Sequence, residues 1–423
     1  MNLSPEQAAG LEKIKEWFSY AEHERQPFRL FGAAGTGKTT LAKYVPIALG
    51  LTGPHDVRYA TYTGKAAHVL RSKGAAPVST IHSGIYIPGP DQDAVKALDD
   101  ARAERTSLIH DLARCPEGSK TIDRRLSELD ESLPDLEKAA RSVRFHWNPD
   151  SVWREAKLII LDEVSMVGPD LARDIEAYGV PVLVLGDPAQ LPPVDGGGYY
   201  TTAAPDHLLD TVHRQALKSP VLELATRVRR ARGASLGLER GDFRKRSLQE
   251  AKEADQVLCW TNHRRWAMVN AMRGEKPGRL VTGDKIMCLT NNQELGVFNG
   301  QQFTVRADRG QGSLIVQDDE GDEREINVYA SGFMGQDEQV AAKNSGAGGR
   351  GDRMLATYAQ AITVHKSQGS EWPSIYIVNE LDAMISQNSA HSGELAAYRA
   401  ARRWAYTAIS RASESVTITA PRR

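Results

Sequence analysis

A short glycine-rich segment near the N-terminus has residue types and spacing suited to holding phosphate groups. Residues 32–39 read Gly-Ala-Ala-Gly-Thr-Gly-Lys-Thr, which fits the pattern G-x-x-x-x-G-K-[ST] without a departure. Glycines let backbone N–H groups curl around phosphates, and a helix that starts directly afterwards presents its positive end to them. The Lys38 ammonium would neutralise the outer phosphates, and the Thr39 hydroxyl would ligate Mg²⁺. The alternative, a glycine-rich turn beside a surface lysine, is disfavoured because an apolar strand precedes the segment and a helical pattern follows it.

Two adjacent carboxylates supply chemistry that phosphate binding alone would not need. Residues 158–163 read Leu-Ile-Ile-Leu-Asp-Glu, an apolar strand that ends in Asp162 and Glu163. Ligands of open α/β sheets bind at the carboxyl ends of the strands. Asp162 would hold Mg²⁺ through water, and Glu163 would polarise the attacking water. Beside residues 32–39, this pair predicts a nucleotide hydrolase rather than a nucleotide-binding module.

A third apolar strand, residues 182–185, runs into a polar loop that could sense the terminal phosphate. Residues 186–193 read Gly-Asp-Pro-Ala-Gln-Leu-Pro-Pro. The side-chain amide of Gln190 would be placed to touch both the terminal phosphate and the water. The plainer alternative is that Asp187 and Gln190 only cap a loop stiffened by its prolines.

Positioning these residues requires buried parallel strands. Apolar runs bounded by polar or glycine residues, typical of strands covered by helices on both faces, occur at 28–31, 57–60, 158–161 and 180–185. A second sheet is expected from residues 256–260, 375–378 and 415–419. Short strands at 285–289, 302–305, 313–316 and 326–329 predict a small barrel inserted in the second α/β domain, and residues 343–351 predict a flexible loop.

Residues 91–140 interrupt the α/β pattern with a charged, helical segment. Apolar residues recur on one helical face at Ile122, Leu126, Leu129, Leu133 and Leu136, and turn residues at 115–118 separate this stripe from an earlier one. The pattern predicts a protruding antiparallel helical hairpin. Pro134 is expected to break the second arm, so that the helix restarts at Ser132. A solvated surface excursion without a role is the alternative.

The composition narrows the class of protein. Lys and Arg total 53 and Asp and Glu 54, a formal net charge of -1, which argues against a binder that relies on bulk positive charge but not against a local basic groove. Cys115, Cys259 and Cys288 lie far apart, which disfavours a disulfide framework or a structural zinc and favours a reducing compartment. With no apolar signal segment and no membrane-length apolar run, we expect a soluble, cytoplasmic, multidomain protein.

An ordered series of motifs resembles the superfamily 1B DNA helicases, in particular the Dda-like and RecD-like group. Besides the segments above, residues 4–7 are similar to the Q motif, 61–67 to motif Ia, 79–83 to the next DNA-contact motif, 186–193 to motif III, 212–215 to motif IV, 363–372 to motif V and 405–412 to motif VI. Ser410 stands where Thr is more usual, which keeps the hydroxyl. Only the 91–140 excursion and the barrel fall outside the resemblance.

The resemblance implies an α/β fold with two RecA-like P-loop domains, a helical-hairpin insertion in the first and an SH3-like β-barrel insertion in the second. The expected boundaries are 1–85 and 148–203 for the first domain, 86–147 for its hairpin or pin insertion, 204–290 and 354–423 for the second domain, and 291–353 for its SH3-like insertion.

The resemblance also implies a nucleotide site between the two domains. The expected catalytic residues are Lys38, Asp162, Glu163, Gln190, Arg214 and Arg411, the two arginines reaching the terminal phosphate from the second domain. The expected ATP contacts are Gln7, Gly35, Thr36, Gly37, Lys38, Thr39, Thr40, Gly369 and Glu371, and the expected metal ligands are Thr39 and Asp162. Guanidinium groups spread charge over phosphate oxygens in the transition state, which agrees with this placement of arginines.

Hydroxyl, imidazole and ammonium groups in the matched motifs form a candidate line of DNA contacts. They are Thr63, Lys65, Thr80, His82, Thr363, His365 and Lys366. Such donors suit phosphates, which carry no sequence information, so sequence-independent tracking is expected. Four further arginines, at 227, 229, 230 and 232, could extend this line, but on a helix they do not share one face, and a solvated surface is an equal alternative.

The resulting hypothesis is an ATP- and Mg²⁺-dependent DNA helicase that moves 5′ to 3′ on single-stranded DNA, with the direction implied by the resemblance alone. Its expected partners are single-stranded DNA, duplex junctions and replication or recombination proteins, without a membrane, and it would act as a monomer. Two alternatives remain open: an RNA-directed superfamily 1 helicase, and a non-catalytic subunit that keeps the ATPase fold in a DNA-processing assembly.

Overall fold

The computed structural model describes residues 3–24, 26–114, 119–140, 143–192, 198–211, 219–292, 294–318, 321–335 and 352–421. The chain divides into two compact units, residues 1–84 with 151–423, and residues 85–150, which are described separately. The predicted turn at 115–118 and the predicted loop at 343–351 lie outside the described residues. Among the described helices, none is both long and apolar enough to cross a membrane.

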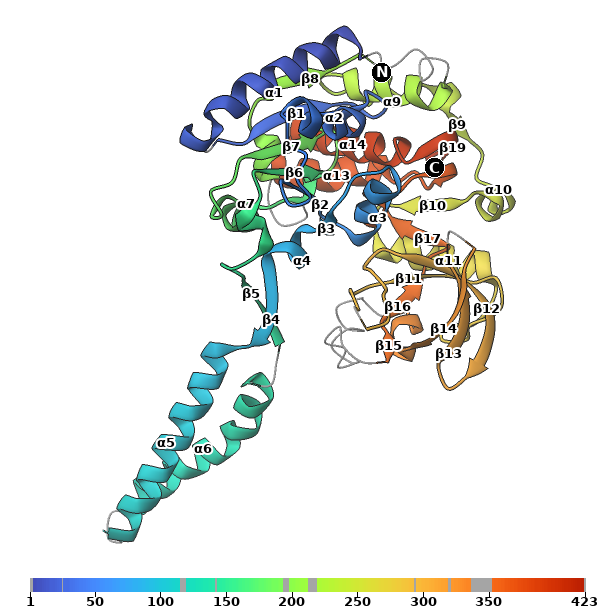
Figure 1. Cartoon of the computed structure of the whole chain (residues 1–423). Helices are drawn as coiled ribbons and strands as arrows, with labels where there is room; N and C mark the ends of the chain where they lie inside the picture. The colour runs from blue at the N-terminus through green and yellow to red at the C-terminus, as the bar shows by residue number, and fades with distance from the viewer. Residues whose placement is uncertain are drawn as a thin grey trace. The chain divides into compact units, whose positions relative to one another are not determined.

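The first sheet of the larger unit is parallel throughout and positions the glycine-rich segment (Figure 1). Its strand order is β3-β2-β6-β7-β1-β8. The strands are β1 (Phe28–Gly32), β2 (Val57–Thr61), β3 (Val78–Thr80), β6 (Leu158–Asp162), β7 (Val182–Gly186) and β8 (His207–Leu209). Strands β6 and β7 are buried at every residue, as continuous apolar strands covered on both faces should be.

Helices cover this sheet and close its core. They are α1 (Pro5–Glu24), α2 (Lys38–Ala48), α3 (Gly64–Ser72), α4 (Ile81–Ile85), α7 (Pro169–Glu176) and α8 (Tyr199–Thr202). Ile14 of α1 and Leu41 of α2 are fully buried with Leu30 of β1 and Leu183 of β7 in one apolar cluster. This packing fixes the start of α2 directly beyond the end of β1, where residues 33–37 turn.

The second sheet is also parallel, with the order β17-β10-β18-β19-β9. Its strands are β9 (Phe243–Arg244), β10 (Gln256–Cys259), β17 (Ala361–Thr363), β18 (Trp372–Ile377) and β19 (Ala412–Thr419), and its helices are α9 (Pro220–Arg230), α10 (Leu248–Glu253), α11 (Asn262–Arg273), α13 (Leu381–Ser392) and α14 (Glu394–Ile409). Helices α9, α13 and α14 share one core with this sheet, whereas α10 and α11 share another. Two parallel sheets flanked by helices confirm the predicted α/β fold.

A six-stranded, mostly antiparallel sheet is inserted in the second domain. Its order is β15-β14-β13-β12-β11-β16. The strands are β11 (Lys285–Cys288), β12 (Gln302–Gly310), β13 (Ser313–Gln317), β14 (Glu323–Val328), β15 (Arg353–Met354) and β16 (Ala356–Tyr358). The two edge strands, β15 and β16, are separated by one residue of chain, so the sheet is nearly closed, as Figure 1 shows. This confirms the predicted barrel, although the sequence did not indicate β15 or β16.

The smaller unit, residues 85–150, is a two-stranded ribbon that leads into a helical hairpin. Strands β4 (Tyr86–Pro90) and β5 (Val143–Trp147) pair antiparallel, and helices α5 (Gln92–Arg114) and α6 (Ser119–Ala140) pack side by side (Figure 1). All five residues of the predicted apolar stripe are buried or half-buried. Three ion pairs, of Arg102 with Glu137, Arg105 with Asp130 and Arg125 with Glu104, join the helices at 2.7, 2.6 and 2.7 Å.

The predicted break of the second arm at Ser132 is wrong, because α6 continues through Pro134. The proline is exposed, so its ring faces away from α5, while Leu129 on the packed side is buried. The Ser132 hydroxyl donates to the Leu129 carbonyl at 2.9 Å, which uses a carbonyl in the turn before the proline. Packing against α5 therefore holds the helix across a residue that would weaken it in isolation.

The hairpin leaves the larger unit at a single point. The Ser151 hydroxyl donates to the Gly84 carbonyl at 2.6 Å, so the two chain crossings are hydrogen-bonded to each other. A Cβ atom at position 84 would lie 2.4 Å from the ring of Trp153, which leaves room for glycine only. Gly84 and Ser151 thus form a closed base for the insertion.

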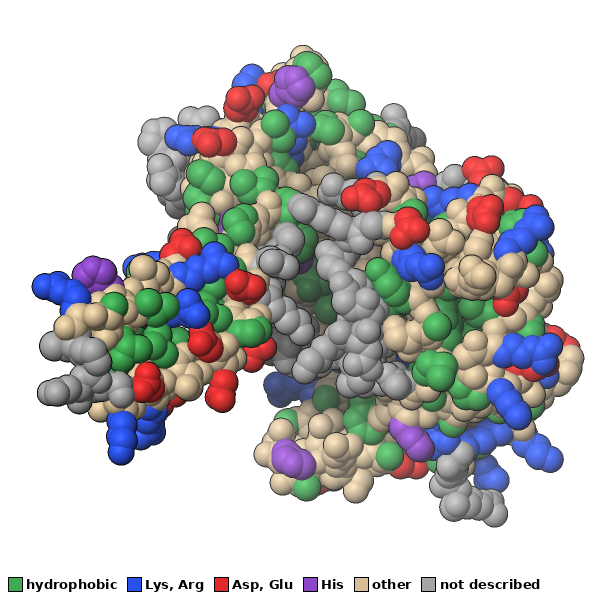
Figure 2. Space-filling view, turned by 90° about the horizontal axis from the view of Figure 1, so that it is seen from below, with side chains coloured by type: hydrophobic (Ala, Val, Ile, Leu, Met, Phe, Trp, Pro, Cys, Tyr) green, Lys and Arg blue, Asp and Glu red, His purple; other side chains and the backbone are tan. Residues whose placement is uncertain are grey.

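Acidic and basic side chains are interspersed over much of the surface shown in Figure 2. This distribution agrees with the net charge of -1 and with the absence of a reliance on bulk positive charge. Inside the fold, the charge that matters most for the barrel is a buried ion pair. Arg273, the last residue of α11, bonds both Asp284 carboxylate oxygens at 2.6 and 2.8 Å, and both side chains are almost fully buried.

The buried pair joins helix α11 to the start of the barrel strand β11. Asp284 also accepts hydrogen bonds from the Val281 backbone at 2.9 Å and from the Gln360 amide at 2.8 Å. The Arg273 guanidinium lies 3.9 Å from the centre of the Tyr358 ring in β16. Asp284 and Tyr358, which contact the Arg273 guanidinium, thus both lie where the barrel meets the second domain.

We expect Asp284→Asn to destabilise the chain by about 3–5 kcal/mol, because it leaves a buried guanidinium without a counter-charge. The matched control is Glu275→Gln, which removes the exposed Glu275–Arg279 pair with its 3.4 Å contact and should cost about 0–1 kcal/mol. Thermal unfolding followed by circular dichroism distinguishes the two variants. Equal melting temperatures would show that the buried pair contributes nothing specific.

Candidate active site

Residues 33–37 form a loop whose backbone geometry depends on glycine. Gly35 and Gly37 have φ angles of 76° and 78°, in the left-handed region that other residues rarely adopt. Gly32 has no room for a side chain, because a Cβ atom there would lie 2.6 Å from Thr36 Oγ1. The Lys38 ammonium donates to the carbonyls of Gly32 and Ala33 at 2.7 and 2.9 Å, and so lies across the loop. The loop has the form of an anion cradle at the N-terminus of α2.

The predicted metal ligands Thr39 and Asp162 are brought together. Thr39 Oγ1 donates to Asp162 Oδ2 at 2.8 Å, and the Glu163 backbone N–H donates to Asp162 Oδ1 at 2.8 Å. Burial and the neighbouring Glu163 raise the pKa of Asp162, while the Thr39 hydrogen bond and the Lys38 charge oppose this rise. A cation bound at this point would stabilise the carboxylate form.

Glu163 has a strained backbone at the end of β6. Its φ and ψ angles of 57° and 46° are left-handed, a conformation that costs a residue with a Cβ atom roughly 1–2 kcal/mol. Non-glycine residues held in this way cluster at functional sites. The left-handed conformation turns the chain sharply after Asp162. The carboxylates of Asp162 and Glu163, although adjacent in sequence, can therefore point in different directions.

The donor set fits a nucleotide with Mg²⁺. A hydroxyl and a carboxylate are hard oxygen ligands, and Mg²⁺ in phosphate-transfer sites is held by one or two protein oxygens together with substrate phosphates. Within the described residues no group of three or more His, Cys, Asp or Glu side chains could hold a metal by itself. The site therefore suits a metal that arrives with phosphates, held by Thr39 and Asp162.

Gln7 of the predicted adenine-binding motif lies against the phosphate loop. Its amide nitrogen donates to the Thr36 carbonyl at 3.3 Å, and its amide oxygen accepts from the Ser4 backbone at 3.0 Å. Gln7 and Thr36 are both buried. These hydrogen bonds join the start of α1 to the phosphate loop. Recognition of adenine by Gln7 stays a prediction.

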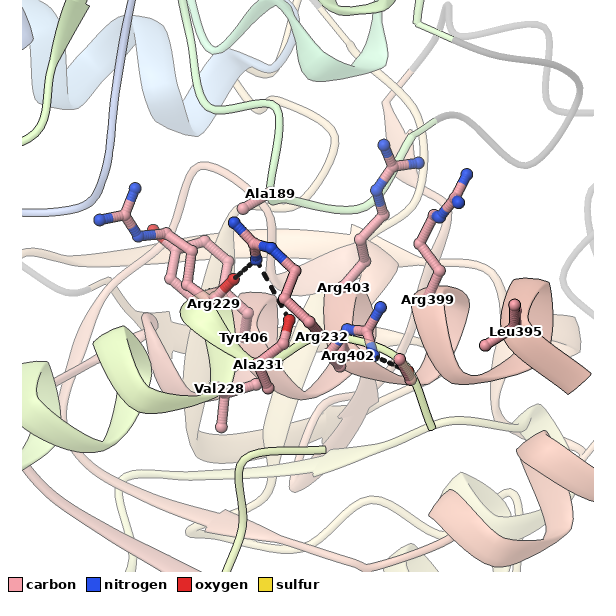
Figure 3. Close-up of a pocket in the computed structure, with 11 residues that line it drawn as sticks. Ala189, Val228, Arg229, Ala231, Arg232, Leu395, Arg399, Arg402, Arg403 and Tyr406 are labelled. Atoms are coloured by element: carbon pink, nitrogen blue, oxygen red, sulfur yellow. Dashed lines mark hydrogen bonds between the residues drawn. The ribbon is translucent and has the colours of Figure 1, made fainter. Parts of the chain in front are cut away.

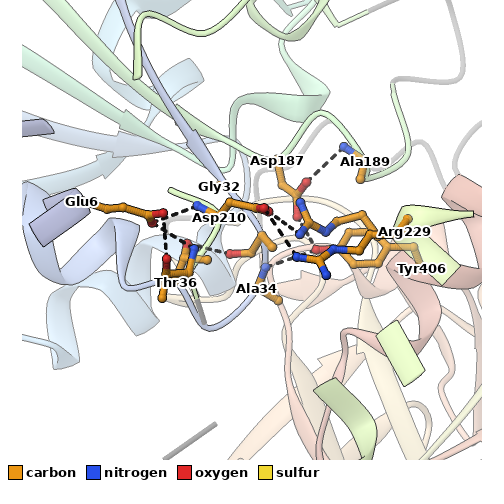
Figure 4. Close-up of polar contacts among 12 residues, drawn as sticks. Glu6, Gly32, Ala34, Thr36, Asp187, Ala189, Asp210, Arg229 and Tyr406 are labelled. Atoms are coloured by element: carbon orange, nitrogen blue, oxygen red, sulfur yellow. Dashed lines mark hydrogen bonds and ion pairs between the residues drawn. The ribbon is translucent and has the colours of Figure 1, made fainter. Parts of the chain in front are cut away.

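A tyrosine from the second domain contacts the phosphate loop directly (Figure 4). The Tyr406 hydroxyl accepts from the Ala34 backbone N–H at 3.1 Å and donates to Asp187 Oδ2 at 2.5 Å. Both side chains are buried, and burial raises the pKa of Asp187 although Lys38 and the Tyr406 hydrogen bond oppose the shift. Burial and Asp187 likewise raise the pKa of Tyr406 well above its ordinary value.

The loop after β7 is held by the second domain through its main chain. The Leu191 N–H donates to Thr407 Oγ1 at 2.9 Å, and the Leu191 carbonyl accepts from the Gln368 amide at 3.0 Å. The neighbouring Gln190 is buried, and its Oε1 has no hydrogen-bond partner among the described residues. Gln190 therefore keeps an acceptor in a loop that both domains hold, beside the strand ends of the first sheet.

Asp187, Tyr406, Thr407 and Gln368 were not among the predicted site residues. Their positions lie inside the quoted motifs, but only the tertiary structure shows that they bond across the two domains. For Tyr406 and Thr407 one sequence signal exists: both are polar residues in a helix, α14, whose neighbouring residues are apolar and buried. Asp187 both caps its loop, by accepting from the Ala189 N–H at 3.0 Å, and bonds Tyr406 of the second domain. The contact of Gln190 with a nucleotide stays a prediction.

The remaining residues that were predicted to contact the nucleotide make no described bond to the phosphate loop. Arg214 lies in residues 212–218, outside the described part of the chain. Arg411 is buried, and its guanidinium donates to the carbonyls of Thr407 and Ser370 at 3.2 and 3.3 Å. Gly369 lies against Thr63, where a Cβ atom would be 3.0 Å from Oγ1. Glu371 is exposed and Thr40 is half-buried in α2. Their contacts with a nucleotide stay predictions.

The predicted DNA contacts of the first domain occupy the ends of β2 and β3. Thr63 caps α3 by accepting from the Ala66 N–H at 3.2 Å. Thr80 is buried, and its hydroxyl donates to Ser83 Oγ at 2.8 Å and accepts from the Ser83 N–H at 3.2 Å. Both hydroxyls thus have local structural bonds, and their contacts with DNA stay predictions.

The other predicted DNA contacts include aromatic neighbours. The Lys65 ammonium lies 5.0 Å from the centre of the Trp372 ring, so motif Ia of the first domain touches motif V of the second. The His82 ring meets Tyr62 edge-on at 5.6 Å, and the surrounding protein lowers its pKa even though much of the side chain is exposed. Burial also lowers the pKa of His365. At both positions the lowered pKa favours the neutral imidazole.

The last predicted contacts, Thr363 and Lys366, flank His365. Thr363 is the last residue of β17, and Lys366 lies in the short 3₁₀ helix His365–Ser367 that follows. Both are half-buried.

The arginines at 227–232 do not form one surface. Arg227 pairs with Glu239 and Asp242 at 3.0 and 2.6 Å. Arg229 is largely buried and pairs at 2.5 Å with Asp210, the residue directly after β8 of the first sheet. Arg227 and Arg229 are therefore structural ion-pair partners.

A phosphate cradle, a strand-end carboxylate pair, and a second parallel α/β domain that bonds to the loops of the first define a two-domain, RecA-like protein of the P-loop class. Comparison with protein families places residues 2–261 in a family described as an AAA domain. The chain belongs to this family. Its ordered motifs resemble those of superfamily 1B helicases, the group to which the RecD and Pif1 names of similar proteins also point.

Individual relatives and solved structures agree with this assignment. The ATP-dependent RecD2 DNA helicase of Deinococcus radiodurans is 28% identical over 269 residues, which cover 56% of this chain and 34% of the relative. The chain thus spans about a third of the length of that relative. Bacteroides Pif1 bound to single-stranded DNA has a TM-score of 0.52 at 19% identity, over 99% of this chain and 92% of that chain.

A second solved structure, Bacteroides Pif1 with ADP-AlF3 and single-stranded DNA, has a TM-score of 0.53 at 18% identity, over 99% of this chain and 93% of that chain. At these identities the two structures show the fold. They confirm the prediction of two RecA-like domains.

We expect Tyr406→Phe to destabilise the chain by about 1–3 kcal/mol, because it leaves Oδ2 of the buried Asp187 without its Tyr406 donor and the Ala34 N–H without an acceptor. Tyr398→Phe, which removes a half-buried hydroxyl from the same helix, is the control. Thermal unfolding of both variants measures the difference. A Tyr406→Phe chain that melts with the wild type would show that the bridge does not hold the two domains.

Proposed function

We propose that this chain is an ATP- and Mg²⁺-dependent DNA helicase that moves 5′ to 3′ on single-stranded DNA and unwinds duplexes. The observation that carries the proposal is the loop at Asp187–Leu191, which both domains hold beside the phosphate cradle. A loop bonded to both domains can convert a change at the phosphates into a change in domain position. The names of the similar proteins, a DNA helicase and structures with single-stranded DNA, support DNA as the substrate.

In this proposal each residue at the cradle has a defined part in hydrolysis. Lys38 leaves the carbonyls of Gly32 and Ala33 to neutralise the outer phosphates of ATP. Glu163 orients and polarises the attacking water, and Gln190 offers its free Oε1 to that water. Mg²⁺, held by Thr39 and Asp162, would neutralise charge that develops on the phosphate oxygens. Arg214 and Arg411 would stabilise the same charge from the second domain once the domains close.

Translocation would follow if the two domains bind DNA with different affinities in the ATP-bound and the ATP-free states. The line of Thr63, Lys65, Thr80 and His82 belongs to the first domain, and that of Thr363, His365 and Lys366 to the second. The Lys65–Trp372 contact, which joins the motifs that carry the two lines, supports this arrangement. Neutral imidazoles, hydroxyls and ammonium groups suit phosphate and sugar contacts, which would make tracking independent of sequence.

The division into two motor domains with a hairpin and a barrel insertion, the monomeric state, replication or recombination partners and the cytoplasmic location belong to the same proposal. The first domain would run through β8 (His207–Leu209), and the barrel insertion would include β11 (Lys285–Cys288) and β16 (Ala356–Tyr358). The hairpin at 85–150 is proposed to act as the strand-separating insertion, from its position between the first DNA motifs and Asp162. Its helices are held mainly by a narrow apolar seam and exposed ion pairs.

We expect Glu163→Gln to bind ATP but to lower its hydrolysis about 10²–10⁴-fold, because it removes the group that polarises water. Lys38→Ala should abolish nucleotide binding or turnover. Steady-state ATPase assays with saturating single-stranded DNA, together with nucleotide-binding titrations, measure both. Undetectable hydrolysis by the wild-type chain would instead favour a non-catalytic subunit, and equal stimulation by a matched RNA would favour the RNA-directed alternative.

The same variants test translocation on duplexes with single-stranded tails. The wild-type chain should unwind a 5′-tailed duplex in preference to a 3′-tailed one, and neither variant should unwind either. Preferential unwinding of the 3′-tailed duplex would overturn the direction, and wild-type unwinding by either variant would overturn the mechanism.

We expect deletion of residues 95–140 to retain DNA-stimulated ATPase activity and to abolish unwinding, because the insertion is a unit with its own closed base. Arg124→Gln, which removes only the exposed Arg124–Glu128 pair at 3.1 Å, is the control and should keep both activities. Unwinding that survives the deletion would assign the hairpin to the surface-excursion alternative.

A further inference from the structure

A cavity of about 390 Å³ lies between the C-terminal end of α9 and one face of α14 (Figure 3). Arginines from both elements line the cavity, and the proposed mechanism uses none of them. Arg229 forms a structural ion pair with Asp210. Leu395, Arg399, Arg402, Arg403 and Tyr406 contribute from α14 at spacings that place them on one helical face. The arginines that line the cavity are Arg229, Arg232, Arg399, Arg402 and Arg403.

The positive charges of this cavity are poorly compensated. The guanidinium groups of Arg399 and Arg403 have no hydrogen bond or ion pair with any described residue. Arg402 donates to the backbone carbonyls of Gly233 and Ser235 at 2.5 and 2.8 Å, and Arg232 donates to backbone carbonyls of α9. No carboxylate lines the cavity among the described residues.

The electrostatics reflect this crowding of like charges. Desolvation and the neighbouring Arg232 and Arg399 lower the pKa of Arg402. Desolvation and Arg399 lower the pKa of Arg403. Several guanidinium groups that face one space repel each other, and an anion in that space would relieve the repulsion.

The geometry favours phosphate among anions. Guanidinium groups bind phosphate through paired, parallel hydrogen bonds. The cavity is large enough for a hydrated phosphate or a pyrophosphate, and Arg399 and Arg403 line it with guanidinium groups that no described residue pairs. The cavity adjoins the nucleotide site, because Tyr406 in its wall bonds the phosphate loop and Asp187, and Ala189 in its wall follows Asp187 by two residues. The candidate DNA contacts lie on other elements, at α3, α4 and residues 363–367.

We propose that the arginine cavity between α9 and α14 is a second phosphate-binding site, separate from the phosphate loop. Its ligand is a phosphate dianion, either free inorganic phosphate or the terminal phosphate of a nucleotide. The site does not depend on the proposed helicase activity, since binding can be measured without hydrolysis.

The experiment compares the full chain with an Arg399→Gln/Arg403→Gln double variant in buffer that contains no phosphate. Inorganic phosphate is added at constant ionic strength, and the melting temperature and calorimetric binding are recorded. We expect phosphate to stabilise the wild-type chain and to bind the double variant at least tenfold more weakly. Without phosphate, the double variant should melt at a higher temperature than the wild type, because two repelling charges have been removed. Arg154→Gln, a change of an exposed arginine in another element, is the control and should behave as the wild type.

A Lys38→Ala background separates the cavity from the phosphate loop. Phosphate stabilisation that persists in this background, and is lost on adding the two arginine substitutions, supports the proposal. In the same background, stabilisation by ATP that the arginine substitutions remove identifies the nucleotide as a source, whereas a response to phosphate alone identifies the free ion.

Two outcomes overturn the proposal. A response that Lys38→Ala abolishes and the arginine substitutions leave intact would place the phosphate in the loop. An arginine variant with unchanged phosphate binding but weakened affinity for single-stranded DNA would make the cavity a nucleic-acid contact. A failure of the helicase proposal leaves each of these readouts unaffected.

Discussion

The hydroxyl of Tyr406 is the interaction on which the arrangement of the site depends. One phenol oxygen accepts from the Ala34 N–H and donates to Asp187, so three segments remote in sequence meet at one atom. A hydroxyl has a single proton to donate, and here it is directed to a carboxyl whose pKa burial has raised. Because the oxygen is buried, neither bond can be replaced by water without opening the interface. The position of α14 is therefore defined relative to the phosphate loop itself, rather than only to the sheet that the helix covers.

Much of the fold followed from hydrophobic pattern. The apolar runs that end at Gly32, Asp162 and Gly186 became fully paired parallel strands, because only strands covered on both faces tolerate such runs. The barrel strands β12, β13 and β14 were indicated by their regular spacing. The two-residue strand β15 and three-residue strand β16 were not, because segments that short carry no periodicity of their own and form only where the sheet nearly closes. Pro134 misled the expectation for α6 because a local rule was applied without the packing of α5.

The site was predictable where its chemistry is contiguous in sequence, as in residues 32–39, or sits at a strand end, as in Asp162 and Glu163. It was not predictable where a residue acts through a partner far along the chain. Tyr406 and Thr407 meet Asp187 and Leu191 across more than two hundred residues. Among the arginines, the sequence could not separate Arg229, which pairs with Asp210, from Arg403, which has no carboxylate beside it in the described part of the chain. Burial and pairing decide these roles, and neither is a property of local sequence.

The closed base at Gly84 and Ser151 has a consequence for how such chains diversify. Because the polypeptide leaves and rejoins the first domain at hydrogen-bonded neighbours, the length and sequence of the intervening segment do not alter the register of any strand in the parent sheet. The entropic penalty for closing a longer loop grows only slowly with its length. An arm at this position can therefore be lengthened, shortened or exchanged with little effect on the sheet to which it is joined. The glycine under Trp153 is the one residue that every such exchange must keep.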